Sequence, residues 1–185
     1  MNAPLFTGQR VRLSVIQSDD EIKRYVNWSR DAEFLRLLDD DPAMPWSAER
    51  MKEELAREPK WDDGFFLVRA LDDDRPIGFV VIFDPHGTHG NATLAIAIGE
   101  KALWGQGYGT DAIRVILRYA FLELNLHRVS LFVLAHNARA IGSYVKCGFR
   151  VEGRVRQAML RDGERSDFIY MGVLKDDWLS AIRSQ

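Results

Sequence analysis

The hydrophobic positions in the first half of the chain fall into short runs bounded by polar and turn-forming residues, a pattern typical of β-strands. One strand is predicted over residues 10–15, and three more over 65–71, 76–84 and 92–99. Short turn-rich segments separate the last three runs, so these runs predict an antiparallel meander.

Two helices are predicted between the first strand and this meander. The segment 19–30 opens with acidic residues, which suit the positive N-terminal end of a helix. A break that contains two prolines follows over 39–46, and Ser47 can then cap a second helix over 48–58.

The hydrophobic period changes in the second half of the chain. Apolar residues recur at helical spacing over 110–124, which predicts a long helix with one buried face. The nearly continuous apolar run 129–135 predicts a strand covered on both faces. Another helix is predicted over 138–147, because Asn137 can cap its start and Gly148 can end it in the left-handed conformation.

The chain closes with a predicted β-hairpin. Its strands lie within 149–156 and 167–174, and Asp162-Gly163 between them is a dipeptide that favours a tight turn. Strands and helices of these kinds together predict a mixed α/β fold.

Composition adds the domain count and the compartment. The chain has 185 residues, of which 46% are hydrophobic, so we expect one globular domain over 1–185. Cys147 is the single cysteine, and no spacing of Cys and His suggests a metal site. No signal peptide or membrane-spanning run is recognisable, and we therefore expect a cytoplasmic protein.

The net charge of −2 hides an asymmetry. Residues 31–63 carry eleven acidic side chains against five basic ones, whereas 101–175 carry twelve basic against six acidic. The acidic segment suits a cationic ligand and the basic segment an anionic one, although solvated helix surfaces explain the acidic segment equally well.

Three glycines, Gly105, Gly107 and Gly109, stand directly before the helix predicted over 110–124. Bare backbone at a helix N-terminus favours a phosphate, because the first N–H groups have no helical partner. A phosphate loop of a nucleotide hydrolase is excluded, since Lys and then Ser or Thr do not follow the last glycine. A dinucleotide site lacks its acidic residue at the end of the next strand. Coenzyme A and a connection without ligand remain.

Three segments make the ligand more specific: "WGQGYGTDA" (104–112), "NARAIGSYVKCGF" (137–149) and "EGRVRQAMLRDGERSDFIYMGVL" (152–174). Together they resemble the GNAT N-acetyltransferase superfamily, in particular its branch of ribosomal-protein N-terminal and spermidine acetyltransferases. The resemblance covers about residues 8–178. Trp104 stands where the general pattern of the superfamily has Gln or Arg, a departure that is usual in this branch.

The resemblance implies the GNAT fold, an α/β fold with a mixed, twisted, mostly antiparallel sheet of about seven strands and helices on both faces. The sheet would open between its fourth and fifth strands to admit acetyl-CoA, the implied co-substrate, and no metal would take part. The implied acetyl-CoA contacts come from the end of the fourth strand, the glycine loop and the next helix: Ala97, Ile98, Gly99, Trp104, Gly105, Gln106, Gly107, Tyr108, Gly109, Thr110 and Asn137. Thr110 and Asn137 can instead cap helices, and Gln106 can simply be exposed.

The resemblance also implies catalytic residues. Tyr144 matches the acid that protonates the departing sulfur, with a buried core tyrosine as the alternative. Glu100 lies near the place where relatives hold a carboxylate base, with a surface glutamate as the alternative. Cys147 is expected to pack rather than to react, since the transfer is direct.

Acidic residues are implied beside the acceptor, where they would attract a cationic amine: Glu33, Asp39, Asp40 and Asp41. The alternative is a solvated loop. Whether Trp28, Trp46 and Trp61 line the acceptor pocket or pack the first helices stays open.

The implied reaction moves an acetyl group to a primary amine. We expect a protein or peptide N-terminal amine first, and a small polycationic amine such as spermidine or an aminoglycoside second. The alternative of another class is a non-catalytic acyl-CoA sensor, which would not need Tyr144. Nucleic-acid binding is disfavoured because the arginines of the last hairpin alternate with acids. We expect no membrane partner, and a homodimer is the assembly considered.

Overall fold

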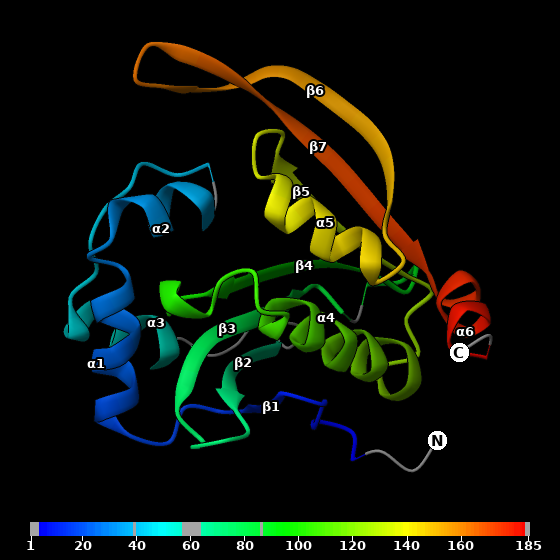
Figure 1. Cartoon of the computed structure of the whole chain (residues 1–185), viewed down its shortest axis with the longest axis horizontal. Coiled ribbons are helices and arrows are strands. Elements are labelled where there is room, and N and C mark those ends of the chain that lie inside the picture. Colours follow the sequence, from blue (N-terminus) through cyan, green and yellow to red (C-terminus); the bar gives the residue numbers. More distant parts are fainter. Residues whose placement is uncertain (1–3, 39, 57–63, 86, 184–185) are drawn as a thin grey trace.

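A seven-stranded sheet organises the structure, a computed structural model that describes residues 4–38, 40–56, 64–85 and 87–183 (Figure 1). The strands are ordered β1-β2-β3-β4-β5-β7-β6 across the sheet. Their bounds are β1 (Val11–Ser14), β2 (Gly64–Ala70), β3 (Pro76–Phe83), β4 (Asn91–Ile98), β5 (Arg128–Leu134), β6 (Arg150–Arg161) and β7 (Glu164–Leu174). The helices are α1 (Asp19–Trp28), α2 (Ala32–Leu38), α3 (Ala48–Ala56), α4 (Tyr108–Arg118), α5 (Ala138–Lys146) and α6 (Lys175–Arg183).

Strands β1 to β4 form the predicted antiparallel meander, and β5, β7 and β6 pair antiparallel in the other half. The two halves meet where β4 runs parallel to β5, with Asn91–Thr93 opposite Arg128–Ser130. No further pair of these two strands is in register in the described chain, so β4 and β5 diverge after Thr93. The opening between the fourth and fifth strands is thereby confirmed.

Helices cover both faces of the meander. On one face α4 packs on alternate residues of β3, among them Val80 and Ile82, and forms the larger apolar core. On the other face Phe79 and Val81 pack against Trp28 of α1 and Phe34 of α2. Figure 1 shows α4 and α5 in front of the sheet, with α1 and α2 beyond the ends of β3 and β4. The predicted α/β fold class is confirmed.

Local sequence explains several ends of these elements. Ser18 and Glu21 form a reciprocal capping box at the start of α1. The Asn137 side chain accepts a hydrogen bond from the N–H of Ala140 and caps α5. At the hairpin turn, Asp162 has φ 51° and Gly163 has φ 79°, the left-handed pair that a tight two-residue turn requires.

The structure corrects four sequence expectations. Helix α4 begins at Tyr108 and its cap is Gly107, so Thr110 lies inside the first turn and is not the cap. The strand predicted to be covered on both faces leaves Phe132 40% exposed. Helices α2 and α6 were not expected. None of the described helices is long and apolar enough to cross a bilayer.

Candidate functional site

A first cavity of about 380 Å³ lies between the end of β4, the glycine loop and α5. Most residues that the sequence assigned to acetyl-CoA line it: Ala97, Ile98, Trp104, Gly105, Gly107, Gly109, Thr110 and Asn137. Gly99, Gln106 and Tyr108 are not among its lining residues. The fold therefore brings the loop, the strand end and the start of α5 around one space.

The glycine loop presents free backbone to this cavity. Gly105 has φ 75° and Gly107 has φ 90°, conformations that L side chains rarely adopt. The first helical hydrogen bond of α4 runs from the N–H of Asp111 to the carbonyl of Gly107, over 2.9 Å. No side chain in the described chain caps this end of α4. The preceding N–H groups of the helix are thus available to an anion.

The other border of the first cavity is the free edge of β4. The N–H of Gly99 donates to the carbonyl of Ile77 over 2.8 Å, so Gly99 faces β3. Backbone groups alternate along a strand, and those of Ile96 and Ile98 therefore face the opening. The carbonyl of Ile98 accepts a hydrogen bond of 2.6 Å from the Trp104 indole. Trp104 thus joins the loop to the edge of β4.

Two predicted contacts point elsewhere. The Gln106 side chain donates to the carbonyl of Ala102 over 2.5 Å and is exposed. Tyr108 packs against the larger core, with the Arg10 guanidinium 5.8 Å from its ring centroid. Of Gln106 and Tyr108, only the backbone stands beside the cavity, as part of the loop.

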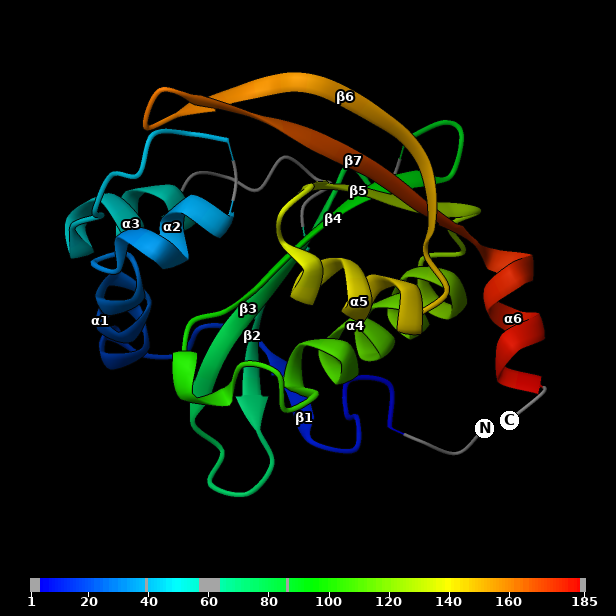
Figure 2. The same cartoon turned by 45° about the horizontal axis from the view of Figure 1, so that its top comes forward.

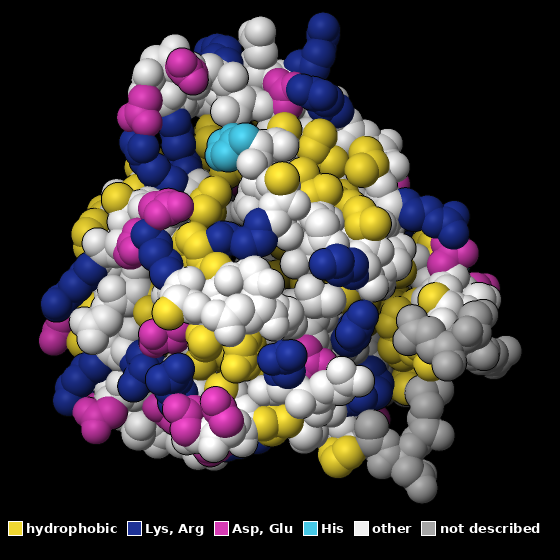
Figure 3. Space-filling model, in the orientation of Figure 1, with side chains coloured by type: hydrophobic (Ala, Val, Ile, Leu, Met, Phe, Trp, Pro, Cys, Tyr) yellow, Lys and Arg dark blue, Asp and Glu magenta, His cyan; other side chains and the backbone are white. Residues whose placement is uncertain are grey.

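Sequence reasoning missed the basic side chains on α5. Arg139 and Lys146 line the first cavity, together with Gly142 and Ser143. Their spacing of three, four and seven places them on one helix face, and this spacing was the available signal. The Arg139 guanidinium lies 3.7 Å from the Trp104 ring centroid. Figure 3 shows Lys and Arg side chains (dark blue) over the area of α4 and α5, which suits an anionic ligand.

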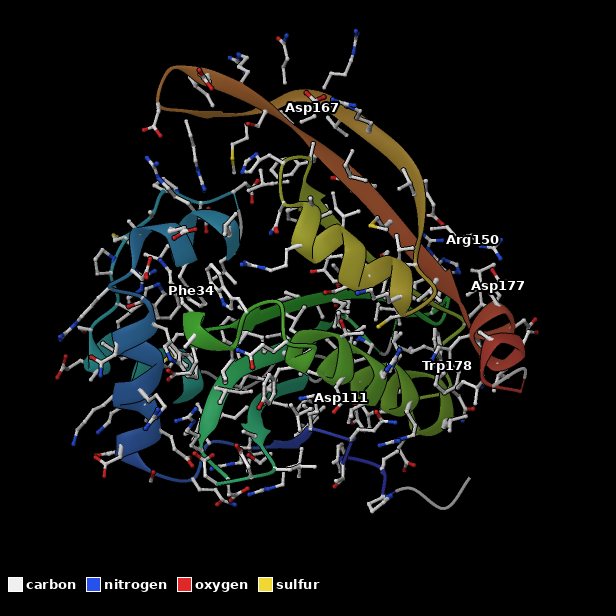
Figure 4. All side chains as sticks on the ribbon, in the orientation of Figure 1. Phe34, Asp111, Arg150, Asp167, Asp177 and Trp178 are labelled. Atoms are coloured by element: carbon white, nitrogen blue, oxygen red, sulfur yellow. The ribbon has the colours of Figure 1, made fainter. Side chains whose placement is uncertain are left out.

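A second cavity of about 1320 Å³ adjoins the first. It lies between α1, α2, α3 and the meander on one side, and β5 and β7 on the other. The residues shared by both linings are Phe34, Leu37, Leu38, Ile96, Asn137, Ala140 and Tyr144. Figure 4 labels Phe34 between α2 and the end of β4. The two spaces therefore meet where β4 and β5 diverge.

Tyr144 stands at this junction. Its side chain is 7% exposed, and its ring packs 5.7 Å from the ring of Phe149. Burial raises the pKa of the Tyr144 hydroxyl, so it keeps its proton at neutral pH. It donates no hydrogen bond to any residue that the structure describes. A protonated donor thus borders both cavities.

Asn137 also borders both cavities. Its side-chain oxygen accepts the N–H of Ala140 over 3.2 Å, which confirms the capping role. The amide nitrogen of Asn137 makes no hydrogen bond within the described residues, so the cap leaves this donor for a ligand.

The predicted base lies outside both linings. The Glu100 carboxylate accepts hydrogen bonds from Arg24 over 3.1 Å and from the Trp28 indole over 3.2 Å. Trp28 packs directly on Gly99, where no side chain would fit. The observed contacts of Glu100 hold α1 against the end of β4, and its role as base stays a prediction.

The predicted acidic residues separate from one another. Asp41 lines the second cavity, whereas Glu33 pairs with Lys101 over 2.7 Å and lines neither. Asp40 is exposed and lines neither cavity, and Asp39 lies outside the described residues. Trp46 lines the second cavity, Trp28 is buried beside it, and Trp61 lies outside the described residues.

Cys147 is a packing residue, as expected. Its thiol is buried and donates to the carbonyl of Thr110 over 3.4 Å, and burial raises its pKa to about 12. No group of three or more metal-binding side chains is present among the described residues.

Comparison with known proteins gives three results. Residues 10–150 match the family model described as an acetyltransferase (GNAT) domain. The chain is 28% identical over 178 residues to the SPbeta prophage-derived uncharacterized N-acetyltransferase YokL of Bacillus subtilis (strain 168), covering 96% of this chain and 97% of YokL. It is 31% identical over 104 residues to the spermidine N(1)-acetyltransferase of Vibrio cholerae, covering 56% and 60%. Spermidine N-acetyltransferase from Vibrio cholerae, solved with CoA and spermine, has a TM-score of 0.82 at 22% identity, covering 91% and 98%.

Proposed function

This chain belongs to the GNAT acetyltransferase family and is an N-acetyltransferase, and from that premise we propose that its first cavity takes acetyl-CoA and its second the acceptor amine. The observation that carries the proposal is the meeting of the two cavities at Tyr144. Acetyl transfer needs both substrates at one point, with the thioester carbonyl carbon within reach of the amine.

The residues around the first cavity fit acetyl-CoA. The free N–H groups of α4 and the side chains of Arg139 and Lys146 suit the pyrophosphate. The outward backbone of Ile96 and Ile98 suits an extended chain with amide groups, because it can pair with such a chain as a strand would. The Asn137 amide can donate to the same chain. The thioester would then lie near Tyr144.

The chemistry at the junction needs a neutral amine and an acid. A primary amine with a pKa of about 10.4 is almost wholly protonated at neutral pH and must lose a proton before attack. The amine nitrogen then bonds to the carbonyl carbon, and the bond from carbon to sulfur breaks. Tyr144 donates its hydroxyl proton to the departing sulfur. Glu100 remains the proposed base for the amine proton.

For the acceptor, we propose the N-terminal amine of a protein or peptide. The second cavity opens to the surface and exceeds the usual volume of a small-molecule site, roughly 300–1,000 Å³. A small polycationic amine is the second candidate, favoured by the relative named for spermidine and by the similar structure that holds spermine.

Thiol release from acetyl-CoA tests the function directly. The panel contains short peptides beginning with Ala, Ser or Met, spermidine, free amino acids and aminoglycosides, and calorimetry measures acetyl-CoA binding in parallel. Release that depends on one acceptor class supports the proposal. Binding of acetyl-CoA without release with any acceptor would favour a sensor, and absence of both would contradict the cavity assignment.

A further inference from the structure

The second cavity has an apolar wall on the side of the meander. The ring of Tyr25 lies 5.1 Å from that of Phe79, 6.1 Å from that of Trp46 and 6.2 Å from that of Phe65. Phe65 and Phe79 are stacked at 5.6 Å, and all four side chains line the cavity. This wall offers broad ring surface rather than charge.

The opposite wall is apolar as well. Phe132 of β5 and Phe168 of β7 line the cavity with their rings 5.2 Å apart in an edge-to-face arrangement. Leu134 and Phe168, both nearly buried, form a small apolar cluster with Met159 of β6. An acceptor between the two walls would therefore contact apolar side chains on both sides.

The hairpin of β6 and β7 holds the two walls together. The hairpin arches over the molecule and its tip approaches α2 (Figure 2). Arg36 of α2 makes two hydrogen bonds to the Asp162 carboxylate at this tip, of 2.7 and 2.8 Å. Arg161 donates to the backbone carbonyls of Arg36 and Asp41. These bonds link the two sides of the cavity and limit the access of water.

Charge is scarce inside this enclosure. Among the described lining residues, the charged side chains are Asp41 and Arg50. Arg50 stacks over Trp46 at 4.4 Å, so it adds positive charge to the aromatic wall. Glu33 and Glu100, which the sequence placed near the acceptor, pair with Lys101 and Arg24 outside the lining. A polycation would thus find few carboxylates for its additional ammonium groups.

We propose that the acceptor is an amine that carries one positive charge on a large apolar or aromatic body, an inference that rests on the proposed acetyl transfer. The amine end lies at Tyr144 and the body between the two apolar walls. A second ammonium group would lose its hydration without gaining a partner there. An apolar enclosure also lowers the pKa of the bound amine by desolvation, which supplies the neutral nucleophile and lessens the demand on a base. Such an amine can be a free arylalkyl amine or a peptide N-terminus with a large apolar first residue.

A matched pair of free amines tests the charge rule. n-Hexylamine and 1,5-diaminopentane have equal length, and a methyl group in one replaces an ammonium group in the other. We expect kcat/KM for hexylamine to exceed that for the diamine by about 30-fold or more, because the second ammonium is buried without a partner. Equal rates, or a preference for the diamine or spermidine, would overturn the inference while leaving acetyl transfer in place. Absence of turnover with every amine would overturn the proposed function as well.

Further acceptors separate the two sources. 2-Phenylethylamine stands for free amines, and tripeptide amides beginning with Phe or Ser stand for peptides. The inference expects the Phe peptide to exceed the Ser peptide by about tenfold or more in kcat/KM, because a ring is buried. The faster of 2-phenylethylamine and the Phe peptide then indicates the source. A preference for the Ser peptide would overturn the inference.

A variant can invert the preference. Phe132→Glu places a carboxylate on a half-exposed position of the lining, where it can pair with a second ammonium. We expect the rate ratio of hexylamine to diamine to fall about tenfold. Val151→Glu is the matched control, since Val151 is an exposed strand residue that lines neither cavity. An unchanged ratio in a folded Phe132→Glu variant would count against the inference, and the comparison in the wild-type chain stands in any case.

Discussion

Replacing Tyr144 by Phe removes one oxygen atom from the junction of the two cavities and leaves the ring in place. The ring contacts Phe149 at 5.7 Å and an interplanar angle of 61°, and Phe can make the same contact. The hydroxyl donates no hydrogen bond to another described residue, so the folded state loses little. We expect the free energy of unfolding to change by less than about 1 kcal/mol.

The effect on catalysis should be far larger. Proton transfer by a positioned acid contributes about 10²–10⁴-fold to a rate, and the site of Tyr144 is 7% exposed, where such a donor acts with little competition from water. Burial raises the pKa of Tyr144, so the hydroxyl carries its proton over the whole neutral and mildly alkaline range. We expect kcat to fall by about 10²-fold or more while the Kd for acetyl-CoA stays within about threefold.

Three measurements check this prediction: thiol release at saturating substrates, calorimetric titration with acetyl-CoA, and thermal unfolding. Tyr170→Phe is the matched control, because Tyr170 is 46% exposed and lines neither cavity. A kcat for Tyr144→Phe close to that of wild type would refute the acid role. Loss of acetyl-CoA binding or of thermal stability in parallel with kcat would instead assign Tyr144 to the packed core.

Four further predictions concern the loop, the core and the base. Gly107→Ala should weaken acetyl-CoA binding about tenfold by calorimetry, since it strains a residue at φ 90° by about 1–2 kcal/mol and crowds the free N–H groups. Gly163→Ala, with φ 79° at the hairpin tip, carries comparable strain and should leave binding unchanged. Asp111→Ala should lower the free energy of unfolding in urea by about 3 kcal/mol, because the buried carboxylate accepts two backbone N–H groups at the start of β1. Burial raises the pKa of Cys147 from 9.0 to about 12, so the stability that it contributes is present below pH 9 and is lost as the pH rises toward 12. Cys147→Ala should flatten that alkaline loss, and the native thiol should react with a disulfide reagent at pH 8 only after unfolding. Glu100→Gln keeps an acceptor for both of its donors; if Glu100 is the base, kcat falls and the acid limb of the pH–rate profile disappears, whereas an unchanged profile refutes that role.

The elements that the sequence predicted well are those with a local cause. The turn at Asp162-Gly163 needs two residues in the left-handed region, and this dipeptide adopts it readily. The end of α5 at Gly148, with φ 94°, has the same kind of cause. The meander follows from short connections that leave adjacent strands antiparallel.

The errors have tertiary causes, with one exception. Helix α2 has seven residues and is held by packing of Phe34 and Leu35 on the sheet, which its sequence alone does not reveal. Asp31 was an available signal, because its carboxylate accepts the N–H groups of Glu33 and Phe34. The exposure of Phe132 depends on which face of β5 the helices leave bare, and no local pattern reports that.

The candidate site divides in the same way. The motif located the glycine loop because a phosphate nest is a local backbone structure. The Glu100 carboxylate could not be placed, since its partners Arg24 and Trp28 lie more than seventy residues earlier in the chain. Likewise, Arg139 gained its meaning only when α5 came to lie against Trp104.

The divergence of β4 and β5 connects the fold to the reaction. Two strands that separate after Thr93 expose backbone N–H and C=O groups along the edge of β4, and unpaired backbone groups in a partly buried position are costly. The Trp104 indole satisfies the carbonyl of Ile98, so one group of the exposed edge is already paired within the protein. The outward groups of Ile96 remain for a partner in the cavity. A ligand with amides along an extended arm is the kind of partner that completes such an edge, and its reactive end would then lie beside Tyr144, where the second cavity begins.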